Sequence, residues 1–318
     1  MTDRSATTER SSKTIDALRA QLTRVILGKP EAIDHVLVAL IAGQHLLLED
    51  VPGVGKTTLA KALARAFAGT FRRVQFTPDL LPADILGASV YNPKDGSFTF
   101  KEGPIFANVL LADEINRASP RTQSALLEAM SEGQVSSEGT TRALPAPFLV
   151  LATQNPIEFH GTYPLPEAQL DRFGLRIGLG YPAPEAELEV LYSQARRHPL
   201  ESVTPVLSAD DVTALQAATR EVRVDRSLGR YVVALAEATR RHPQVRLGCS
   251  PRGSLMLFRA AQARALLEGR GFATPEDVKA EAVSVLAHRL GLDTKARYTG
   301  VSREDLVRGV LDSVPVPA

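Results

Sequence analysis

A glycine-rich segment at residues 50–58 combines the residue types that hold a chain of phosphates. Gly53 and Gly55 are followed directly by Lys56 and Thr57. Glycines let backbone N–H groups approach a polyanion closely, and the helix expected next presents its positive N-terminus. The lysine supplies a point charge at the β- and γ-phosphates, and the threonine hydroxyl can ligate Mg²⁺. This pattern predicts a binding loop for a nucleoside triphosphate. Its expected contacts are Pro52, Gly53, Val54, Gly55, Lys56, Thr57 and Thr58.

One position departs from the usual pattern of such loops, which has glycine where this chain has Asp50. The rest of the pattern is intact, with an apolar run at 45–49 before the glycines and a helical pattern after them. The alternative interpretation is a glycine turn that precedes an ordinary helix. The strand and helix on either side favour the phosphate loop, because the motif needs both.

Two carboxylates, Asp113 and Glu114, follow the apolar run at 109–112. In an open α/β sheet, ligands bind at the carboxyl ends of the strands. We expect Asp113 to hold the Mg²⁺ shell through water, and Glu114 to orient and activate an attacking water. The alternative is a pair of acids near the start of the helix that Ser119 caps. The phosphate loop upstream favours the catalytic interpretation.

A second apolar run, 148–153, ends in polar residues that include Asn155. A polar side chain at the end of a central strand can lie between the carboxylate and the γ-phosphate, and we assign that position to Asn155. The alternative is that Asn155 and Pro156 form only a turn.

These motifs require a parallel sheet to bring them together. Apolar runs alternate with helical patterns up to about residue 181, which is typical of a parallel sheet covered on both faces. Beyond it helical runs dominate, at about 184–197, 208–220, 227–241, 251–268 and 275–289. We therefore expect a disordered leader at 1–12, an α/β nucleotide-binding core at 13–181 and a smaller all-α lid at 182–318. Hairpins are expected around Asp95-Gly96 and Glu138-Gly139, within 88–102 and 133–147.

Composition excludes several classes. The chain has 318 residues, 44% of them hydrophobic and 23% charged, and a formal charge of +1, which gives no general attraction for nucleic acid or anionic membrane. A single cysteine, Cys249, excludes an internal disulfide, and six scattered histidines show no metal-binding spacing. There is no apolar secretory signal and no run long enough to cross a bilayer. We expect a cytoplasmic protein without membrane insertion.

The longer motifs resemble the MoxR family of AAA+ ATPases. The resemblance covers residues 20–300 and is most specific in four runs, at 49–57, 110–134, 153–156 and 165–173. It implies ATP hydrolysis with Mg²⁺ by a ring, commonly a hexamer, with ATP at the subunit interfaces. It also implies that 88–102 is the clade's insert in its second helix, and that 133–147 is the hairpin before Asn155.

The resemblance assigns further residues. Arg172 matches the arginine finger that reaches the neighbour's γ-phosphate, where a planar guanidinium stabilises transition-state charge. Arg252 matches a lid arginine expected to contact the γ-phosphate in its own subunit. Arg117 and Arg121 can act across the interface. The segment with Val25, Ile26 and Gly28 matches the stretch that contacts adenine.

Relatives of this kind act as chaperone-like factors that mature or activate partner proteins, often with a separate von Willebrand factor A domain protein. ATP-driven remodelling of a client is therefore the expected function. One alternative is a nucleic-acid motor, although the second hairpin offers Arg142 without a basic cluster or exposed aromatic run. The others are the motor subunit of a metal chelatase and a nucleotide-binding scaffold without turnover. The presence of Glu114, Asn155 and Arg172 argues against the scaffold.

Overall fold

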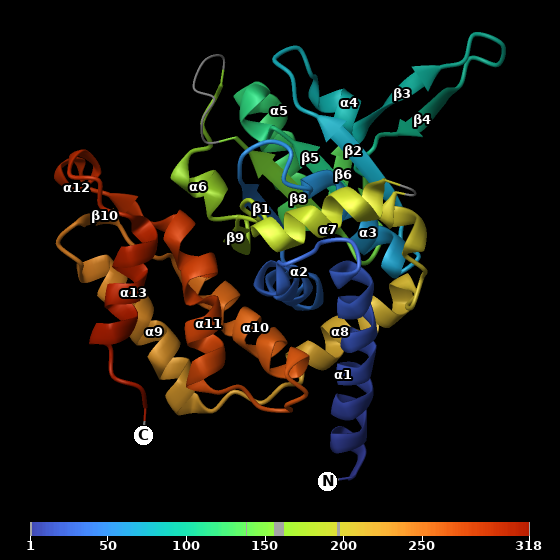
Figure 1. Ribbon diagram of the computed structural model, residues 1–318. Helices are drawn as coiled ribbons and strands as arrows, with labels where there is room; N and C mark the ends of the chain where they lie inside the picture. The colour runs from blue at the N-terminus through green and yellow to red at the C-terminus, as the bar shows by residue number, and fades with distance from the viewer. Residues whose placement is uncertain (1, 138, 156–161, 196–197, 318) are drawn as a thin grey trace.

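The structure is a computed structural model that describes residues 2–137, 139–155, 162–195 and 198–317. Its centre is a five-stranded parallel sheet in the order β2-β5-β8-β1-β9 (Figure 1). The central strands are buried on both faces, so their sequences are unbroken apolar runs. The expected α/β class is confirmed. The strands are β1 (Leu46–Glu49), β2 (Phe71–Gln75), β5 (Val109–Asp113), β8 (Leu149–Gln154) and β9 (Leu175–Ile177).

The strand register brings the predicted motifs to one edge of the sheet. Leu48 pairs with Thr153, and Ala112 pairs with Ala152. Because the strands are parallel, Asp113, the residues after Thr153 and the loop after β1 all emerge at the carboxyl edge. We use "carboxyl edge" for this side of the sheet and "amino edge" for the side where the strands begin.

Helices cover both faces of the sheet. Alternate strand side chains such as Leu46 and Leu48 share one core with helices α1 to α3, whereas Leu47 and Leu110 face helices α4 and α5 on the other side. The bounds are α1 (Thr2–Thr23), α2 (Pro30–Ala42), α3 (Lys56–Ala66), α4 (Pro82–Leu86) and α5 (Pro120–Glu132). Ser119 caps α5 with its side chain and Pro120 occupies the first turn.

Two antiparallel hairpins leave the sheet layers. One is β3 (Gly87–Tyr91) with β4 (Phe98–Glu102), which projects from the body of the molecule (Figure 1). The other is β6 (Gln134–Ser137) with β7 (Thr140–Ala143), and its turn residue Glu138 lies outside the described residues. The Arg142 guanidinium lies 3.8 Å from the Phe100 ring centroid, so the two hairpins contact each other.

The remainder of the chain is mainly helical. The elements are α6 (Glu167–Leu170), α7 (Pro184–Gln194), α8 (Ala209–Arg220), α9 (Arg226–Arg241), α10 (Pro251–Leu267), α11 (Pro275–Leu286), α12 (Thr294–Tyr298) and α13 (Arg303–Ser313), with short 3-10 helices η1 (Ile115–Arg117), η2 (Pro199–Ser202) and η3 (Ala287–Arg289). Side chains of α8 and α10 share a core with α2. One feature differs from an all-helical expectation: β10 (Val245–Leu247) pairs with β11 (Gly291–Leu292). Strands this short leave no apolar run to detect.

The expectation of a disordered leader at 1–12 is wrong, because α1 begins at Thr2. Ile15, Leu18 and Leu22 are fully buried and anchor the second half of this helix. The polar first half contains neither glycine nor proline, so it can extend the anchored helix at one hydrogen bond per residue. Lys13 pairs with Glu9 at 2.8 Å one turn away.

Across the described part of the chain, no helix combines the length and the apolar character that crossing a bilayer requires.

Candidate active site

The loop at 51–55 has the backbone shape that a phosphate site requires. Gly53 and Gly55 take positive φ angles of 86° and 98°, which side chains disfavour. Gly55 is the N-cap of α3, so the helix starts at Lys56 and its free N–H groups point toward the loop. The Lys56 ammonium donates to the Asp50 carbonyl at 2.8 Å, which holds it across the loop.

The side chain of Asp50 explains why glycine is not needed at that position. Oδ1 accepts from the Val51 N–H at 2.9 Å, and Oδ2 accepts from the N–H groups of Leu179 and Gly180 at 2.5 and 2.7 Å. The buried carboxylate therefore ties the start of the phosphate loop to the segment that follows β9. The Oδ2 atom of this carboxylate is directed at the N–H groups of Leu179 and Gly180.

Asp113 and Glu114 are held by the hydroxyl of Thr153. The Thr153 Oγ1 donates to Asp113 Oδ1 at 2.6 Å and accepts from the Glu114 N–H at 2.8 Å. Glu114 has a φ of 56°, a conformation that non-glycine residues rarely adopt and that is often found at functional sites. The Thr153 hydroxyl therefore stabilises the strained turn that aims the Glu114 side chain.

Each of the two carboxylates also has an arginine partner in this chain. Arg73 reaches Asp113 Oδ2 at 2.5 Å from β2, and Arg117 reaches Glu114 Oε2 at 3.0 Å. Burial lowers the pKa of Lys56, and the carboxylates of Asp50, Asp113 and Glu114 oppose that shift. Lys56 and the acidic pair thus share one electrostatic environment, as the sequence predicted from two separate motifs.

The structure also brings the segment expected to contact adenine to the phosphate loop. A Cβ built on Gly55 would lie 3.8 Å from Ile26 Cδ1. Gly28 has a φ of 70°, and a Cβ there would lie only 2.9 Å from the Ala186 Cβ of α7. Val25 is buried beside Ile26 in the same core. This turn therefore lies between the phosphate loop and α7.

Asn155 follows β8 at the carboxyl edge and lines a cavity of about 380 Å³ with Glu49 and Asn116. Its neighbour Pro156 lies outside the described residues. The buried Oδ1 of Asn116 has no hydrogen-bond partner within the described chain, so this cavity presents a polar wall next to Asn155.

Arg172 and Arg252 lie elsewhere. Arg172 donates to the Leu127 carbonyl at 2.9 Å and to Ser131 Oγ at 2.7 Å, and Arg252 reaches the same Ser131 oxygen at 3.3 Å. Ser131 is in the last turn of α5, next to Met130, whose carbonyl accepts from His45 at 3.0 Å. His45 comes just before β1, so the two arginines gather at the amino edge.

The structure places Arg252 at the opposite edge of the sheet from the phosphate loop, although the family resemblance assigns it to the γ-phosphate of its own subunit. The phosphate loop follows the carboxyl end of β1, so the length of that strand separates the two places, about 13 Å at ~3.3 Å per residue. The positive charge of Arg252 even contributes to lowering the pKa of His45 at the amino edge. The sequence motif at 250–253 gives the residue type, but not the edge of the sheet at which the lid places it.

The donor set fits a hydrated Mg²⁺ held together with phosphate oxygens. Among the described residues, no group of three or more His, Cys, Asp or Glu side chains gathers as a metal cage. Mg²⁺ commonly keeps several waters and binds through one or two carboxylates plus substrate phosphates. Thr57, in the first turn of α3, and Asp113 supply the hydroxyl and carboxylate that such an ion uses.

Sequence reasoning missed three contributors: Thr153, Arg73 and Ser131. Thr153 is 1% exposed at the end of the apolar run 148–152, and a buried polar side chain at that place was a detectable signal. Arg73 and Ser131 have no distinctive pattern, because their roles depend on which strand or helix lies beside them.

Known protein families match both parts of the chain. The ATPase family associated with various cellular activities (AAA) matches residues 45–175, and the AAA lid domain matches residues 237–310. A solved structure from Cytophaga hutchinsonii, described as a candidate ATPase, superposes with a TM-score of 0.91 at 38% identity and covers 98% of each chain.

Curated relatives match nearly end to end. Protein YeaC of Bacillus subtilis is 50% identical over 93% of this chain and 92% of its own length. Chaperone MoxR1 of Mycobacterium tuberculosis is 44% identical, over 96% of this chain and 82% of its own. Protein MoxR of Methylorubrum extorquens is 32% identical over 93% of both chains.

Proposed function

Because this chain belongs to the MoxR family of AAA+ ATPases, we propose that it hydrolyses ATP with Mg²⁺ in a ring of identical subunits and uses the cycle to remodel a partner protein. The observation that supports this proposal most directly is the pair of separated sites: a phosphate loop with acidic residues at the carboxyl edge, and two arginines at the amino edge. Each is half of an ATP site that needs a second subunit.

The residues at the carboxyl edge have separate roles in binding ATP and in hydrolysing it. Backbone N–H groups of 52–58 and the Lys56 ammonium bind the phosphates, and the turn with Val25, Ile26 and Gly28 contacts the base. Mg²⁺, held by Thr57 and through water by Asp113, neutralises phosphate charge when bound. Glu114 orients and activates the attacking water, and the Asn155 side chain lies between the carboxylate and the γ-phosphate.

The arginines at the amino edge serve the site of the next subunit. A guanidinium that stabilises charge on the transferred phosphoryl group must approach it from outside the cradle formed by the subunit's own loop. Arg172 comes from the loop before β9 and Arg252 from the first turn of α10, yet both reach Ser131. We therefore assign both to the neighbour's γ-phosphate.

The division into a core at 13–181 and a lid at 182–318 supplies the moving parts. The core and the lid share one hydrophobic core through α2, α8 and α10. A conformational change at the nucleotide is therefore transmitted from one to the other. The hairpin arm of β3 and β4 projects away from this body and is a suitable lever on a client. A separate von Willebrand factor A domain protein is the partner we propose for client recognition, in the cytoplasm.

The test is a trapped ring. Glu114→Gln keeps the side-chain shape but removes the base, so it should bind ATP, hydrolyse it slowly and hold the assembled state. Purified from its own cells with ATP and Mg²⁺, it should enrich a client or a von Willebrand factor A protein. Lys56→Ala is the control, because it should bind ATP weakly.

A different set of captured molecules would redirect the proposal. Enrichment of nucleic acid or replication proteins, with DNA-stimulated hydrolysis, would replace remodelling by a nucleic-acid motor. Enrichment of the other subunits of a metal chelatase would point to that assembly instead. Hydrolysis that persists in Lys56→Ala would refute the assigned ATP site.

A further inference from the structure

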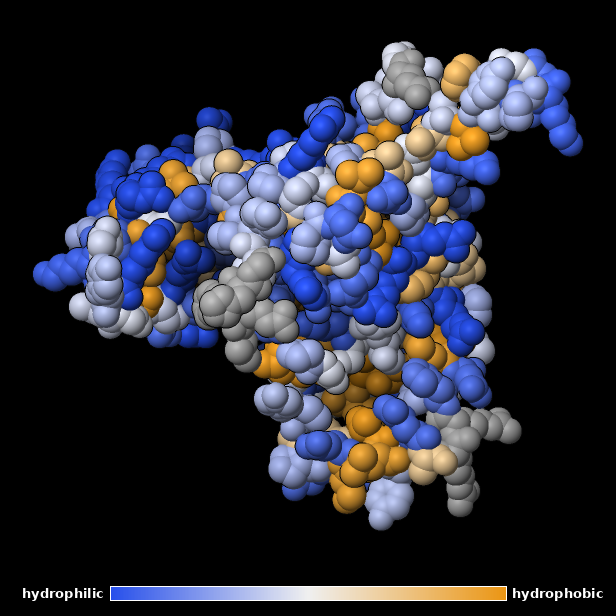
Figure 2. All heavy atoms as spheres, turned by 90° about the horizontal axis from the view of Figure 1, so that it is seen from above, coloured by the Kyte–Doolittle hydropathy of each residue, from blue (hydrophilic) through white to orange (hydrophobic). Residues whose placement is uncertain are grey.

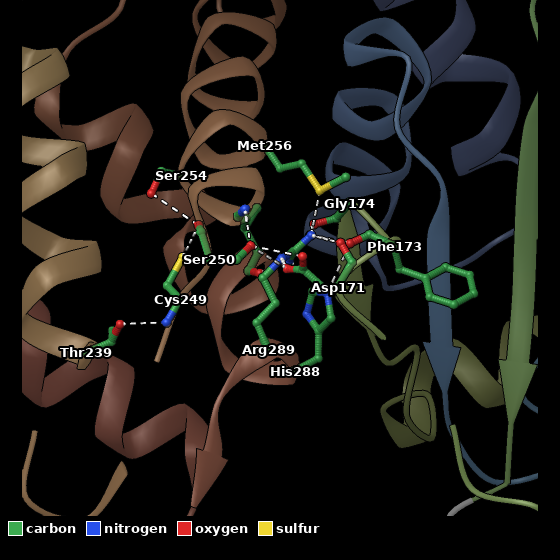
Figure 3. Close-up of polar contacts among 12 residues, drawn as sticks. Asp171, Phe173, Gly174, Thr239, Cys249, Ser250, Ser254, Met256, His288 and Arg289 are labelled. Carbon is green, nitrogen blue, oxygen red and sulfur yellow. Dashed lines mark hydrogen bonds and ion pairs between the residues drawn. The ribbon is translucent and has the colours of Figure 1, made fainter. Parts of the chain in front are cut away.

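A buried arginine joins the lid to the core at the amino edge (Figure 3). Arg289, in η3, has a side chain only 1% exposed, and its Nε lies 3.1 Å from Oδ1 of Asp171. The same guanidinium donates to the Gly174 carbonyl at 3.1 Å and to the Phe173 carbonyl. It therefore holds the stretch between α6 and β9 by side chain and backbone together.

The Asp171 carboxylate reaches a second lid element at the same time. The Ser250 hydroxyl donates to Oδ1 and Oδ2 of Asp171, each at 2.9 Å. Ser250 is also the N-cap of α10, where its oxygen accepts from the Gly253 N–H at 3.1 Å. We call Asp171, Ser250 and Arg289 the junction. It connects the residue before Arg172 with the residue two before Arg252.

The start of α10 is shaped to leave room for this arginine. A Cβ built on Gly253 would lie 2.8 Å from Arg289 Cδ and 2.7 Å from Cys249 Sγ, closer than side chains tolerate. Gly253 is helical and is not among the residues with positive φ, so its backbone does not need glycine. Glycine is needed at position 253 because a side chain there would overlap Arg289 and Cys249. The motif that contains Arg252 thus packs directly against Arg289.

Stability alone is a poor explanation for such a charge. Burial lowers the pKa of Arg289 to about 10, although the Asp171 carboxylate opposes the shift, so the group is still cationic at neutral pH. Desolvating an ion pair often costs as much as the attraction returns, and apolar side chains of similar volume are commonly at least as stable. What the pair supplies is a fixed orientation of the two segments that it joins.

We propose that Arg289 is a positioning residue: through Asp171 and Ser250 it fixes Arg172 and Arg252 as one pair directed at the neighbouring subunit's ATP. This inference rests on the proposed function of those two arginines. The fork of the guanidinium grips the loop that carries Arg172, while the Asp171 carboxylate fixes the helix start that carries Arg252. Both arginines then reach Ser131 from different elements in the same arrangement.

The first test compares two lid ion pairs of the assembled enzyme. Arg289→Met should lower kcat for ATP by about 10-fold or more, because small misplacement of a group in the transition state is costly. Its KM for ATP should stay close to that of the unmodified protein, because its own phosphate loop is intact. Arg270→Met is the matched control. It breaks the lid pair between Arg270 and Asp277, 2.6 Å apart, and should leave kcat unchanged.

The second test asks in which subunit the defect lies. Lys56→Ala subunits have intact arginines but a defective ATP site, so mixing them with Arg289→Met subunits should restore turnover at the mixed interfaces. Arg172→Ala subunits should be rescued in the same way. An Arg289→Met mixture that stays inactive while the Arg172→Ala mixture recovers would overturn the inference, as would normal kcat in Arg289→Met alone.

Failure of the proposed function has a different signature. If Arg172→Ala and Arg252→Ala both turn over ATP normally, the arginines do not serve a neighbour, and it is the proposed function that falls. If Arg289→Met does not fold, Gly253→Ala takes its place. It keeps every polar group and raises helix propensity, so a loss of turnover that Lys56→Ala subunits rescue would come from displacement of the side chains packed against residue 253, Arg289 and Cys249. Normal turnover in Gly253→Ala would contradict the inference.

Discussion

The hydroxyl of Thr153 donates to the Asp113 carboxylate at 2.6 Å across two neighbouring strands, and the same oxygen accepts from the N–H of Glu114. The Thr153 side chain thus fixes the positions of both Asp113 and Glu114. We expect Thr153→Val, which keeps the volume, to lower kcat by about 10–100-fold, because misplaced groups lose catalysis steeply. KM for ATP should change little. Steady-state kinetics measures both.

Thr153→Ser is the matched control for that variant. It keeps the hydroxyl and should stay close to the unmodified rate. If Thr153→Val turned over ATP normally, the hydroxyl would have no role in aiming Glu114.

The buried Asp50 carboxylate is expected to contribute to stability as well as to the shape of the loop. Asp50→Gly restores the glycine that such loops usually have, but leaves the N–H groups of Leu179 and Gly180 without their acceptor. The free energy of unfolding should fall by roughly 2–4 kcal/mol, because hydrogen bonds to a charged group are the stronger kind. Urea denaturation measures it, and Asp50→Asn, which keeps one acceptor oxygen, should lose less.

Stability should also fall in mild acid because of His45. Burial lowers the pKa of this imidazole to about 4, helped by Arg252 and opposed by the Met130 carbonyl. Nδ1 accepts from the Val150 N–H at 3.0 Å, which protonation would prevent. The unfolded chain binds a proton below pH ~6.5 and the native state does not, so stability is lost as pH falls from there toward 4, by about 1.4 kcal/mol per pH unit.

Denaturation at pH 7 and pH 5 tests this effect. His45→Gln should lose less stability over that interval than the unmodified protein does. His198→Gln is the control: because position 198 is exposed, this variant should lose as much stability as the unmodified protein. His288, also buried with its pKa held well below the usual range, contributes to the slope that remains. An unchanged pH dependence in His45→Gln would show that His45 already binds its proton in the native state.

The projecting hairpin should matter for the client and not for basal hydrolysis. Phe98 on β4 is 71% exposed, and its ring lies 5.2 Å from the exposed ring of Tyr91 on β3. In the space-filling view, hydrophobic side chains are visible on this projecting arm (Figure 2). Replacing both rings by serine should leave basal ATP turnover unchanged and reduce client capture in the Glu114→Gln background.

Val233→Ser is the control for the hairpin variant, because Val233 is 51% exposed on α9 and remote from the arm. Undiminished capture by the hairpin variant would mean that the client contacts another surface.

The sheet was largely predictable because its central strands are buried on both faces. Such strands must be apolar throughout, and β1, β5 and β8 each give an unbroken run that ends in a polar motif. Helices α7 to α11 were predictable from periodicity to within a few residues, as α10 illustrates with Ser250 and Pro251 at its start, whereas α12 and α13 were not predicted. The resemblance to MoxR proteins was confirmed by relatives that match nearly end to end.

What could not be predicted depends on contacts between distant segments. The polar first half of α1 looked like a disordered leader, because an anchored helix can extend through residues that contribute no apolar surface. The position of Arg252 at the amino edge could not be predicted, because its motif does not say where the lid lies. Arg289 showed no pattern at all: its partners Asp171 and Phe173 are more than a hundred residues away in the chain.

The separation of the phosphate loop from the arginine pair also has a consequence for symmetry. In a two-fold interface the same face of both copies is used, so the phosphate loop and the arginines would both have to lie on that one face. They lie at opposite edges of the sheet instead. A complete site needs unlike patches to meet, which makes the assembly head-to-tail and gives it a direction. Such contacts close into a ring only when the rotation per subunit divides a full turn, and otherwise form a helical filament. Each subunit then has one upstream and one downstream neighbour, and an inactivating substitution in its arginines harms only one of them.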